Sequence, residues 1–201
     1  MTANRDIGTD VDKVFRSLLM GETVSHIEHL MVAPHCLQNK VLALIEDEIE
    51  KAKHGRPSYI GVKLNSLTDK DIIEKLIDAS EAGVKIELII RGICCLVPAV
   101  PELTENITVI SVVGRFLEHS RIYRFGVGEE EKVYISSADF MTRNTLRRVE
   151  VAVPIYDLAI KKQICHIFDT VLADDAKGKM QTRNREYIDR MLGEKKLDAQ
   201  E

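Results

Sequence analysis

The sequence predicts an α/β fold in which helices flank a mixed β-sheet. In the first half of the chain, strand-like and helix-like patterns alternate, and the strands are nearly continuous runs of Ile, Val and Leu. Such runs are typical of strands that are covered on both faces. In the second half, strand-like segments follow one another closely, which suggests hairpins and therefore antiparallel pairs in the same sheet.

Three helices are predicted within this pattern. The first covers residues 37–55, where apolar residues recur at helical spacing until a glycine and a proline end the pattern. The second follows a capping residue, Thr68 or Asp69, and is closed by Gly83. The third is amphipathic and covers residues 158–173.

Strands fill the intervals between and beyond the helices. They are predicted at residues 26–34, 59–65, the first part of 84–98, 107–114, 119–126, 132–139 and 150–155. The strand that opens segment 84–98 contains the run ELIIR and is expected to be fully buried. This pattern of strands and helices favours a mixed sheet in an α/β sandwich. We find no internal repeat with a period of roughly 20–50 residues.

The two ends of the chain differ from its middle. Residues 1–22 are polar, with a weak helical pattern around residues 11–19, whereas residues 23–175 contain the strong strand and helix patterns. Residues 176–201 are rich in charge and have few apolar anchors, so we expect a tail with one surface helix. A chain of 201 residues is long enough for one domain with a substantial core.

Composition limits the possible functions. Apolar residues make up 45% and charged residues 30%, as in ordinary globular proteins. The net charge of −4 gives no indication of a nucleic-acid partner, so an anion site has to be a local cluster of Arg, Lys and His. No apolar run approaches the roughly 20 residues of a membrane span, and the polar start is unlike a signal peptide. The four cysteines form no CxxC pair or disulfide framework, which favours buried, reduced thiols and a cytoplasmic location.

Arg91 is the first candidate for binding an anion. It ends the run ELIIR, and Gly92 follows it. A guanidinium at a strand end, beside a glycine that admits a ligand closely, is a natural contact for an anionic group. The alternative is a structural salt bridge at the strand end, and the residues alone leave both interpretations open.

His119 and Arg121 are a second candidate pair. They lie two positions apart in the predicted strand 119–126, so we expect both side chains on one face. An imidazole can accept or pass on a proton or a phosphoryl group, and a guanidinium can neutralise the oxygens of a phosphoryl group in transfer. The alternative is a surface histidine beside an exposed arginine, which is the commoner outcome for an isolated His-x-Arg.

The segment YISSADFMTRN places hydroxyls and a carboxylate at a strand end, on Ser136, Ser137 and Asp139. Such a turn can bind phosphate or orient a histidine, although Ser and Asp also favour turns without any ligand. Arg147 and Arg148 precede the next strand and form another basic feature at a strand end. Paired arginines at such a position are often simply solvated.

Lys63 and Asn65 are weaker candidates. They alternate with apolar residues and share one face of a strand, where a lysine can meet phosphate or reach solvent. His26, His29 and His35 flank another strand without the spacing or partners of a metal site, so we interpret them as structural. The motifs GxxxxGKS, GxxxxGKT and GxGxxG are absent, which excludes a P-loop and a Rossmann fingerprint.

Together these motifs resemble the last domain of bacterial polyphosphate kinase. The strings IIRGICCLVP, GRFLEHSRIYRF, YISSADFMTRN and RRVEVAVPI occur in the family's order and spacing, and LMVAP and IGVKLNSLTDKDIIEKL are similar as well. The resemblance runs from about His26 to Asp174, which is most of the chain, and it rests on several long motifs at once. The opening TANRDIGTDVDKVF looks like the end of the preceding domain of that enzyme, so residues 1–22 are interpreted as its remnant.

The resemblance implies an activity and a fold. The family transfers the terminal phosphate of ATP reversibly to inorganic polyphosphate, with Mg²⁺ and through a phosphohistidine. The domain is similar to phospholipase D, in which two related halves, each with an HxK motif, build one site. ATP, ADP and polyphosphate are the implied partners, with no nucleic acid, and a homo-oligomer is implied as well.

The resemblance also assigns roles to single residues. Arg91 and Arg148 match positions that clamp ATP or polyphosphate oxygens, with Arg121 beside them. His119 matches a second histidine that assists transfer as an acid/base or phosphate-binding group, whereas the phosphorylated histidine and most Mg²⁺ contacts belong to the preceding domain. Arg121 replaces the lysine of HxK and Gly126 replaces a later aspartate, which speaks against phosphodiesterase activity. The supporting residues are Lys63, Asn65, Ser136, Ser137 and Asp139.

Three hypotheses follow, in this order of preference. The first is the catalytic half of a polyphosphate kinase site, inactive or nearly so alone, because half of a phosphate clamp loses most of the rate. The second is a stand-alone module that binds polyphosphate or nucleotide without chemistry. The third is a phospholipase D-like phosphodiesterase that a second copy completes across a two-fold axis.

Overall fold

The computed structural model describes residues 2–22, 24–190 and 196–201 of the chain. Its strands are β1 (Met31–Ala33), β2 (Tyr59–Leu64), β3 (Lys85–Ile90), β4 (Ile107–Val112), β5 (Arg121–Phe125), β6 (Lys132–Ser136), β7 (Glu150–Pro154), β8 (Gly178–Gln181) and β9 (Tyr187–Asp189). Within the described residues they form one nine-stranded sheet in the order β1-β7-β6-β5-β2-β3-β4-β8-β9. Strands β2, β3 and β4 run parallel, and the other neighbours pair antiparallel. The predicted mixed sheet is confirmed.

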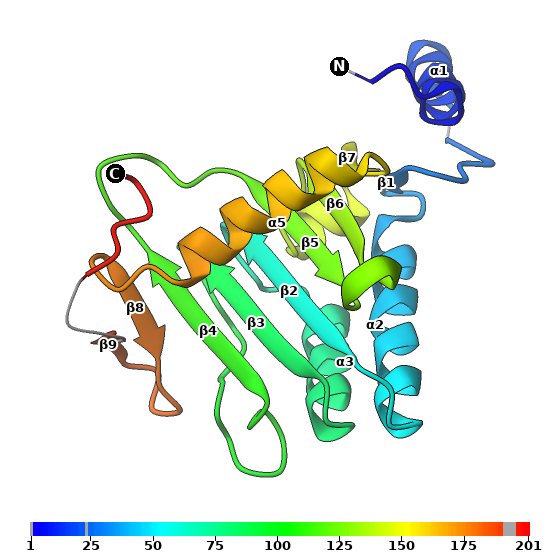
Figure 1. Cartoon of the computed structure of the whole chain (residues 1–201). Coiled ribbons are helices and arrows are strands. Elements are labelled where there is room, and N and C mark those ends of the chain that lie inside the picture. The colour runs from blue at the N-terminus through cyan, green and yellow to red at the C-terminus, as the bar shows by residue number, and fades with distance from the viewer. Residues whose placement is uncertain (1, 23, 191–195) are drawn as a thin grey trace.

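Helices cover both faces of this sheet. They are α1 (Arg5–Met20), α2 (Leu37–Lys53), α3 (Lys70–Glu81), α4 (Thr142–Leu146) and α5 (Leu158–Leu172), with a 3₁₀ turn at Gly128–Glu130. Figure 1 shows α5 lying across one face, α2 and α3 side by side on the other, and α1 at the corner beyond β1. None of the helices in the described ranges is long and apolar enough to cross a bilayer.

Alternation along the strands separates two hydrophobic cores. In β3, Ile86, Leu88 and Ile90 pack with the residues of α2 and α3, whereas Ile89 belongs to a second cluster with Phe168 of α5. Since successive strand residues point to opposite faces, apolar side chains at consecutive positions are buried under different helices. This two-sided burial is the reason for the continuous Ile, Val and Leu runs.

The start of α3 shows why Asp69, and not Thr68, caps this helix. The Asp69 carboxylate accepts a hydrogen bond from the main-chain nitrogen of Ile72 at 3.2 Å, as expected of an N-cap. It also accepts from Nε2 of Gln38 at 3.0 Å and from Oγ1 of Thr145 at 2.6 Å. The helix cap therefore also ties α2 and α4 to α3.

The strand predicted at residues 26–34 is wrong for most of its length, because β1 covers only Met31–Ala33. Upstream of it, the main-chain nitrogens of residues 28–30 donate to the Asp10 carboxylate of α1. The carbonyl oxygens of residues 27, 28 and 30 accept from the Lys40 ammonium group. Side chains satisfy this backbone in place of a strand partner, and His26 adopts a positive φ of 54°.

Two further expectations are corrected by the sheet topology. The close succession of β4 and β5 suggested a hairpin, but β4 pairs with β3 and β8, and β5 pairs with β2 and β6. The hairpin expectation is confirmed only for β5–β6 and β6–β7. The surface helix expected within 176–201 is wrong for residues 178–189, which contain β8 and β9; residues 191–195 lie outside the described residues.

The α5 face of the core generates a stability prediction. Phe168 is fully buried and lies under the Arg124 guanidinium, with its ring centroid 5.1 Å from Arg124 Cζ. We expect Phe168→Ala to lower the free energy of unfolding by about 3–5 kcal/mol, because it leaves a cavity. The neighbouring Ile167 is 46% exposed, and Ile167→Ala is expected to cost about 1 kcal/mol or less. Urea unfolding of both variants checks this; equal losses would contradict the packing.

Candidate functional site

The predicted site residues gather at one edge of the sheet. The parallel strands β2 and β3 end there, and β5 begins there because it runs antiparallel to β2. The pairing of Arg121 with Ser136 brings the end of β6 to the same edge, and the pairing of Ser136 with Ala152 adds the start of β7. Segments that are far apart in the sequence therefore present their polar ends to one region, as the strand-end pattern predicted.

Arg91 and His119 meet at this edge. Nη2 of Arg91 lies 3.2 Å from Nδ1 of His119. A guanidinium only donates, so Nδ1 accepts in this arrangement and the imidazole carries its proton on Nε2. Nε of Arg91 also donates to Oδ1 of Asn65 at 2.7 Å and to the main-chain oxygen of Glu118 at 2.9 Å. Arg91 is therefore oriented by three groups while its side chain remains half-buried.

Asp139 fixes the residue that orients Arg91. Its carboxylate accepts from the main-chain nitrogen of Asn65 at 2.6 Å, from Asn65 Nδ2 at 3.1 Å and from the nitrogen of Ser66 at 3.3 Å. It also accepts two hydrogen bonds from Arg121, at 3.3 and 3.0 Å. A continuous hydrogen-bonded path thus runs from Asp139 through Asn65 and Arg91 to His119.

The ionisation of Asp139 follows from these contacts. Burial by itself acts to raise the pKa of its carboxyl group, but hydrogen bonds from Arg121 and Asn65 outweigh burial and leave the pKa below its ordinary value. The carboxylate is therefore charged under ordinary conditions. It is also paired with Arg121, whose side chain is only 13% exposed.

Lys63 supports the loop that carries His119. Its side chain is 1% exposed, and its ammonium group lies 3.2 Å from Oε2 of Glu118. It also donates to Oγ and to the main-chain oxygen of Ser120, at 3.0 and 3.2 Å. Burial lowers the pKa of Lys63, and the Glu118 carboxylate offsets only part of this effect.

The two serines bind the neighbouring backbone. Oγ of Ser136 donates to the main-chain oxygen of Val151 at 3.3 Å and accepts from the nitrogen of Ala138 at 3.0 Å. Oγ of Ser137 donates to the Glu150 carboxylate and accepts from the nitrogen of Val151 at 3.1 Å. Both hydroxyls stabilise the start of the segment that joins β6 to β7 and contains α4.

The structure does not bring Arg148 into contact with Arg91 or His119. Arg148 is exposed just before β7, and within the described ranges its side chain makes no hydrogen bond or ion pair. One strand assignment is also wrong, because β5 begins at Arg121 and leaves His119 in the preceding loop. His119 and Arg121 therefore do not share a strand face; Nη1 of Arg121 instead donates to the main-chain oxygen of His119 at 3.2 Å.

Local structure explains why position 126 is a glycine, where the resemblance expects an aspartate. It follows β5 with a φ of 89°, a backbone conformation that strains other residues. An added Cβ would also lie 3.2 Å from Nζ of Lys51. The turn between β5 and β6 therefore favours glycine at this position.

Sequence reasoning missed Glu118. Its main-chain oxygen holds Arg91 and its carboxylate pairs with Lys63, so it joins two candidate residues. The only signal was its position directly before His119, and nothing in the local pattern named its partners.

The cysteines also differ from expectation: all four are free, but Cys95 is exposed and the other three are only partly buried.

The described residues offer no metal cluster. No three His, Cys, Asp or Glu side chains converge in the ranges that the structure describes. The residues around Arg91 and His119 therefore do not fit a Mg²⁺ site by themselves.

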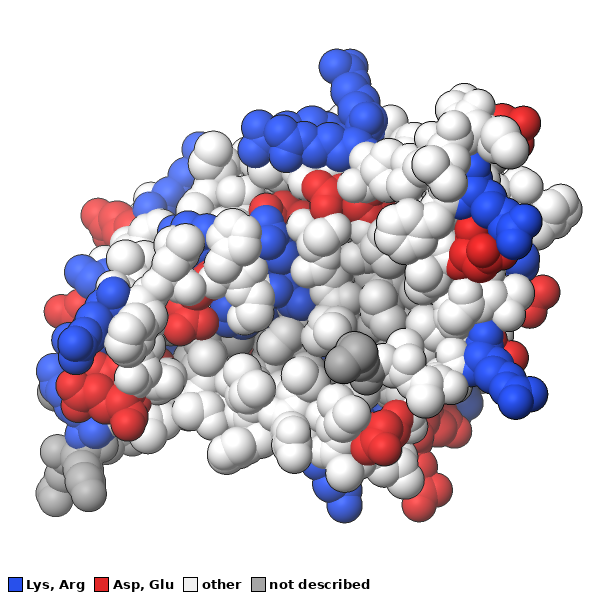
Figure 2. Space-filling view, turned by 90° about the horizontal axis from the view of Figure 1, so that it is seen from above, with Lys and Arg blue, Asp and Glu red and all other residues white. Residues whose placement is uncertain are grey.

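Figure 2 shows Lys and Arg gathering along one margin of the molecule and, mixed with Asp and Glu, on the side where β8 and the carboxyl-terminal end lie.

Comparison with known proteins shows the family. The profile of the Polyphosphate kinase C-terminal domain 2 family matches residues 30–200. The chain belongs to this family. A polyphosphate kinase of Bacillus cereus is 47% identical over 187 residues, and one of Staphylococcus epidermidis is 47% identical over 182 residues. These matches cover 93% and 90% of this chain but 27% and 25% of the relatives. The chain thus spans about a quarter of their length.

Solved structures agree with this assignment. The crystal structure of polyphosphate kinase from Porphyromonas gingivalis matches all of this chain and 31% of its own, with a TM-score of 0.93 and 42% identity. A phospholipase D family member from Salmonella typhimurium matches 76% of this chain and 96% of its own, with a TM-score of 0.56 and 15% identity. The second match shows the fold alone, and it confirms the phospholipase D-like half-domain predicted from the polyphosphate kinase motifs.

The Asp139 contacts generate a prediction with a pH dependence. Asp139→Asn leaves the Arg121 guanidinium without its charged partner, and we expect it to lower the free energy of unfolding by about 3 kcal/mol at pH 7. Because folding lowers the pKa of Asp139, its stabilisation is complete above about pH 4 and is lost as the pH falls through the folded value. The difference between wild type and variant should therefore shrink in acid.

Urea unfolding between pH 7 and pH 3 measures this difference. Asp12→Asn is the control, since Asp12 forms an exposed pair with Arg16 and is 59% exposed. That change is expected to alter stability by less than about 1 kcal/mol. A pH-independent difference for Asp139→Asn would show that its charge is not what stabilises the fold.

Proposed function

We propose that this domain is the carboxy-terminal catalytic half of a polyphosphate kinase. It contributes phosphate-binding residues to the reversible transfer of the terminal phosphate of ATP to inorganic polyphosphate. The observation that carries the proposal is the contact between Arg91 and His119 at an accessible sheet edge. The family membership supports it, because the relatives are named polyphosphate kinase.

The chemistry of this pair suits phosphoryl transfer. Arg91 can donate several N–H groups to phosphate oxygens, and it is held in place by Asn65 and Glu118 before any ligand arrives. His119 carries its proton on Nε2 and can donate it to the same ligand, or assist as an acid or base. Phosphoryl transfer depends mainly on positioning and on charge stabilisation, and this arrangement provides both.

Other residues extend the clamp or support it. Arg148 is exposed at the same edge and would add a second guanidinium to the phosphate oxygens. Arg121 is already bound to Asp139, so its proposed contribution to phosphate is electrostatic, through its charge near the site. Bound Mg²⁺ would neutralise phosphate oxygens, but the described residues do not fit it, so we assign its contacts to groups outside this domain.

A phospholipase D-like hydrolysis is not favoured. The HxK lysine of that chemistry is replaced by Arg121, and this guanidinium is engaged with Asp139 by two hydrogen bonds. The stand-alone binding module uses the same residues as the proposed site, and it differs from the catalytic half only in whether transfer occurs.

Binding of tripolyphosphate to the chain tests the site. We expect Arg91→Ala to weaken binding at low salt by about tenfold or more, since charge-assisted hydrogen bonds to phosphate are lost. Arg91→Lys should recover part of the affinity, because it keeps the charge without the planar fork. Calorimetric titration measures both. Arg16→Ala is the control, as it removes an arginine from an exposed pair on α1. Equal affinities of wild type and Arg91→Ala would contradict the proposal.

Transfer itself is tested with ATP labelled on its terminal phosphate. With Mg²⁺ and ATP, we expect the chain alone to yield neither acid-labile label on protein nor labelled polyphosphate, because half of the clamp loses most of the rate. Label that appears and is lost in His119→Ala would mean that His119 is itself the nucleophile. In that case the chain is a self-sufficient transferase and the half-site proposal fails.

A further inference from the structure

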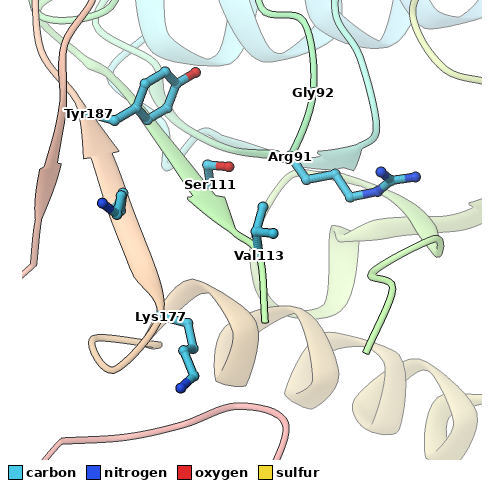
Figure 3. Close-up of a pocket in the computed structure, with 7 residues that line it drawn as sticks. Arg91, Gly92, Ser111, Val113, Lys177 and Tyr187 are labelled. Carbon is cyan, nitrogen blue, oxygen red and sulfur yellow. The ribbon is translucent and has the colours of Figure 1, made fainter. Parts of the chain in front are cut away.

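A hollow opens beside Arg91 at the carboxyl end of β4. It has a volume of about 190 Å³, and Figure 3 shows Arg91 and Lys177 on either side of the end of β4, with Ser111 on the strand and Tyr187 facing it from the neighbouring hairpin. The lining residues are Arg91, Gly92, Ser111, Val113, Lys177, Lys179 and Tyr187. Three of these seven residues are cationic.

The sheet itself places the two lysines. Strand β8 pairs antiparallel with β4, and Lys179 lies directly opposite Ser111, so the two side chains share a face. The turn before β8 is held by Asp174, whose Oδ1 accepts from the nitrogens of Lys177 and Gly178 at 2.7 and 2.8 Å. An added Cβ at Gly178 would clash with the main-chain oxygen of Asp174, so this turn requires glycine.

Two more hollows share lining residues with this one. One, of about 360 Å³, runs from Arg91 to Arg115 and Glu118. The other, of about 430 Å³, lies between Arg115 and Lys177. Arg115 is exposed and rests on Phe116, with its Cζ 5.3 Å from the ring centroid. Four cations thus lie around the end of β4, and the three hollows that they line share residues with one another.

Acidic groups also lie near these cations, but the ion pairs of the two lysines are long. Lys177 lies 3.8 Å from Asp198 and Lys179 lies 3.5 Å from Asp189, with the lysines 48% and 54% exposed. Loose, exposed ion pairs of this kind are worth little and are readily exchanged for a stronger anion. The carboxylates of Glu118 and Glu201 also line the neighbouring hollows. Burial raises the pKa of Tyr187, so its phenol remains a hydrogen-bond donor.

We propose that Arg115, Lys177 and Lys179 form a track that begins beside Arg91 and binds the distal part of a linear polyphosphate. The track would hold phosphates beyond those at Arg91 and His119, and the inference rests on the proposed function. Its chemistry favours a polymer of phosphate over a nucleotide, because the cations line several hollows that share residues. A repeating anion can occupy all of them at once, and its affinity then rises with length.

Length-dependent binding tests the track. The probes are tripolyphosphate and a polyphosphate of about one hundred phosphates, titrated into the chain at low salt. We expect Lys177→Gln/Lys179→Gln to weaken binding of the long polymer about tenfold and to change binding of tripolyphosphate less than about twofold. Adding Arg115→Gln should weaken binding of the long polymer further.

The matched control removes two exposed lysines elsewhere in the fold, Lys53 at the end of α2 and Lys85 at the start of β3. Lys53→Gln/Lys85→Gln changes the net charge equally, at positions that are 55% and 68% exposed, and is expected to bind both probes as the wild type does. If this control weakens the long polymer as much as Lys177→Gln/Lys179→Gln does, binding follows overall charge and the track is wrong. Thermal unfolding of every variant establishes that each is folded.

The outcomes separate this inference from the proposed function. If Arg91→Ala weakens binding of both probes and Lys177→Gln/Lys179→Gln weakens binding of neither, the track is overturned and the proposed function stands. If Lys177→Gln/Lys179→Gln weakens binding of the long polymer and Arg91→Ala changes binding of neither probe, the track is supported and the proposed site is overturned. If the wild type binds neither probe, both are overturned.

Discussion

The buried carboxylate of Asp139 is the constraint on which the candidate site depends. It joins the segment after β2 to the first residue of β5 by accepting from Asn65, Ser66 and Arg121. Asn65 in turn holds Arg91, and Arg91 holds His119. A charge that is this well satisfied can remain buried, whereas loss of one partner leaves the other unpaired. The site is therefore preorganised by a group that need not touch a ligand.

The layered architecture explains why the site lies at an edge. Two of the hydrophobic clusters occupy opposite faces of the sheet, so a polar side chain within a strand needs a partner, as Lys63 finds in the partly buried Glu118. Arg91 follows the last residue of β3 and is only half-buried, so its guanidinium reaches solvent from a rigid base. A sheet edge thus combines fixed geometry with access, which phosphate binding requires.

Local charge matters more here than total charge. The chain carries a net charge of −4, yet Arg91, Arg115, Lys177 and Lys179 surround one strand end. An acidic exterior disfavours general association with polyanions, and a confined basic cluster restores attraction at one place. The same arrangement makes salt a sensitive probe of the site, because exposed charges are screened within about 10 Å at 0.1 M.

The sequence by itself determined the mixed sheet, the two-sided core and the family, because strand runs, helix caps and long motifs are local signals. It also indicated that Arg91, His119 and Asp139 lie at strand ends. Only the tertiary structure decided their partners. Asp139 meets Asn65 across 74 positions, and Lys179 meets Ser111 across a strand pair that no local pattern announces. The strand at residues 26–34 was predicted too long, and the hairpin of β8 and β9 was missed, for the same physical reason. Asp10, Lys40 and strand β4 are distant in sequence from these segments, and their hydrogen bonds satisfy the backbone there.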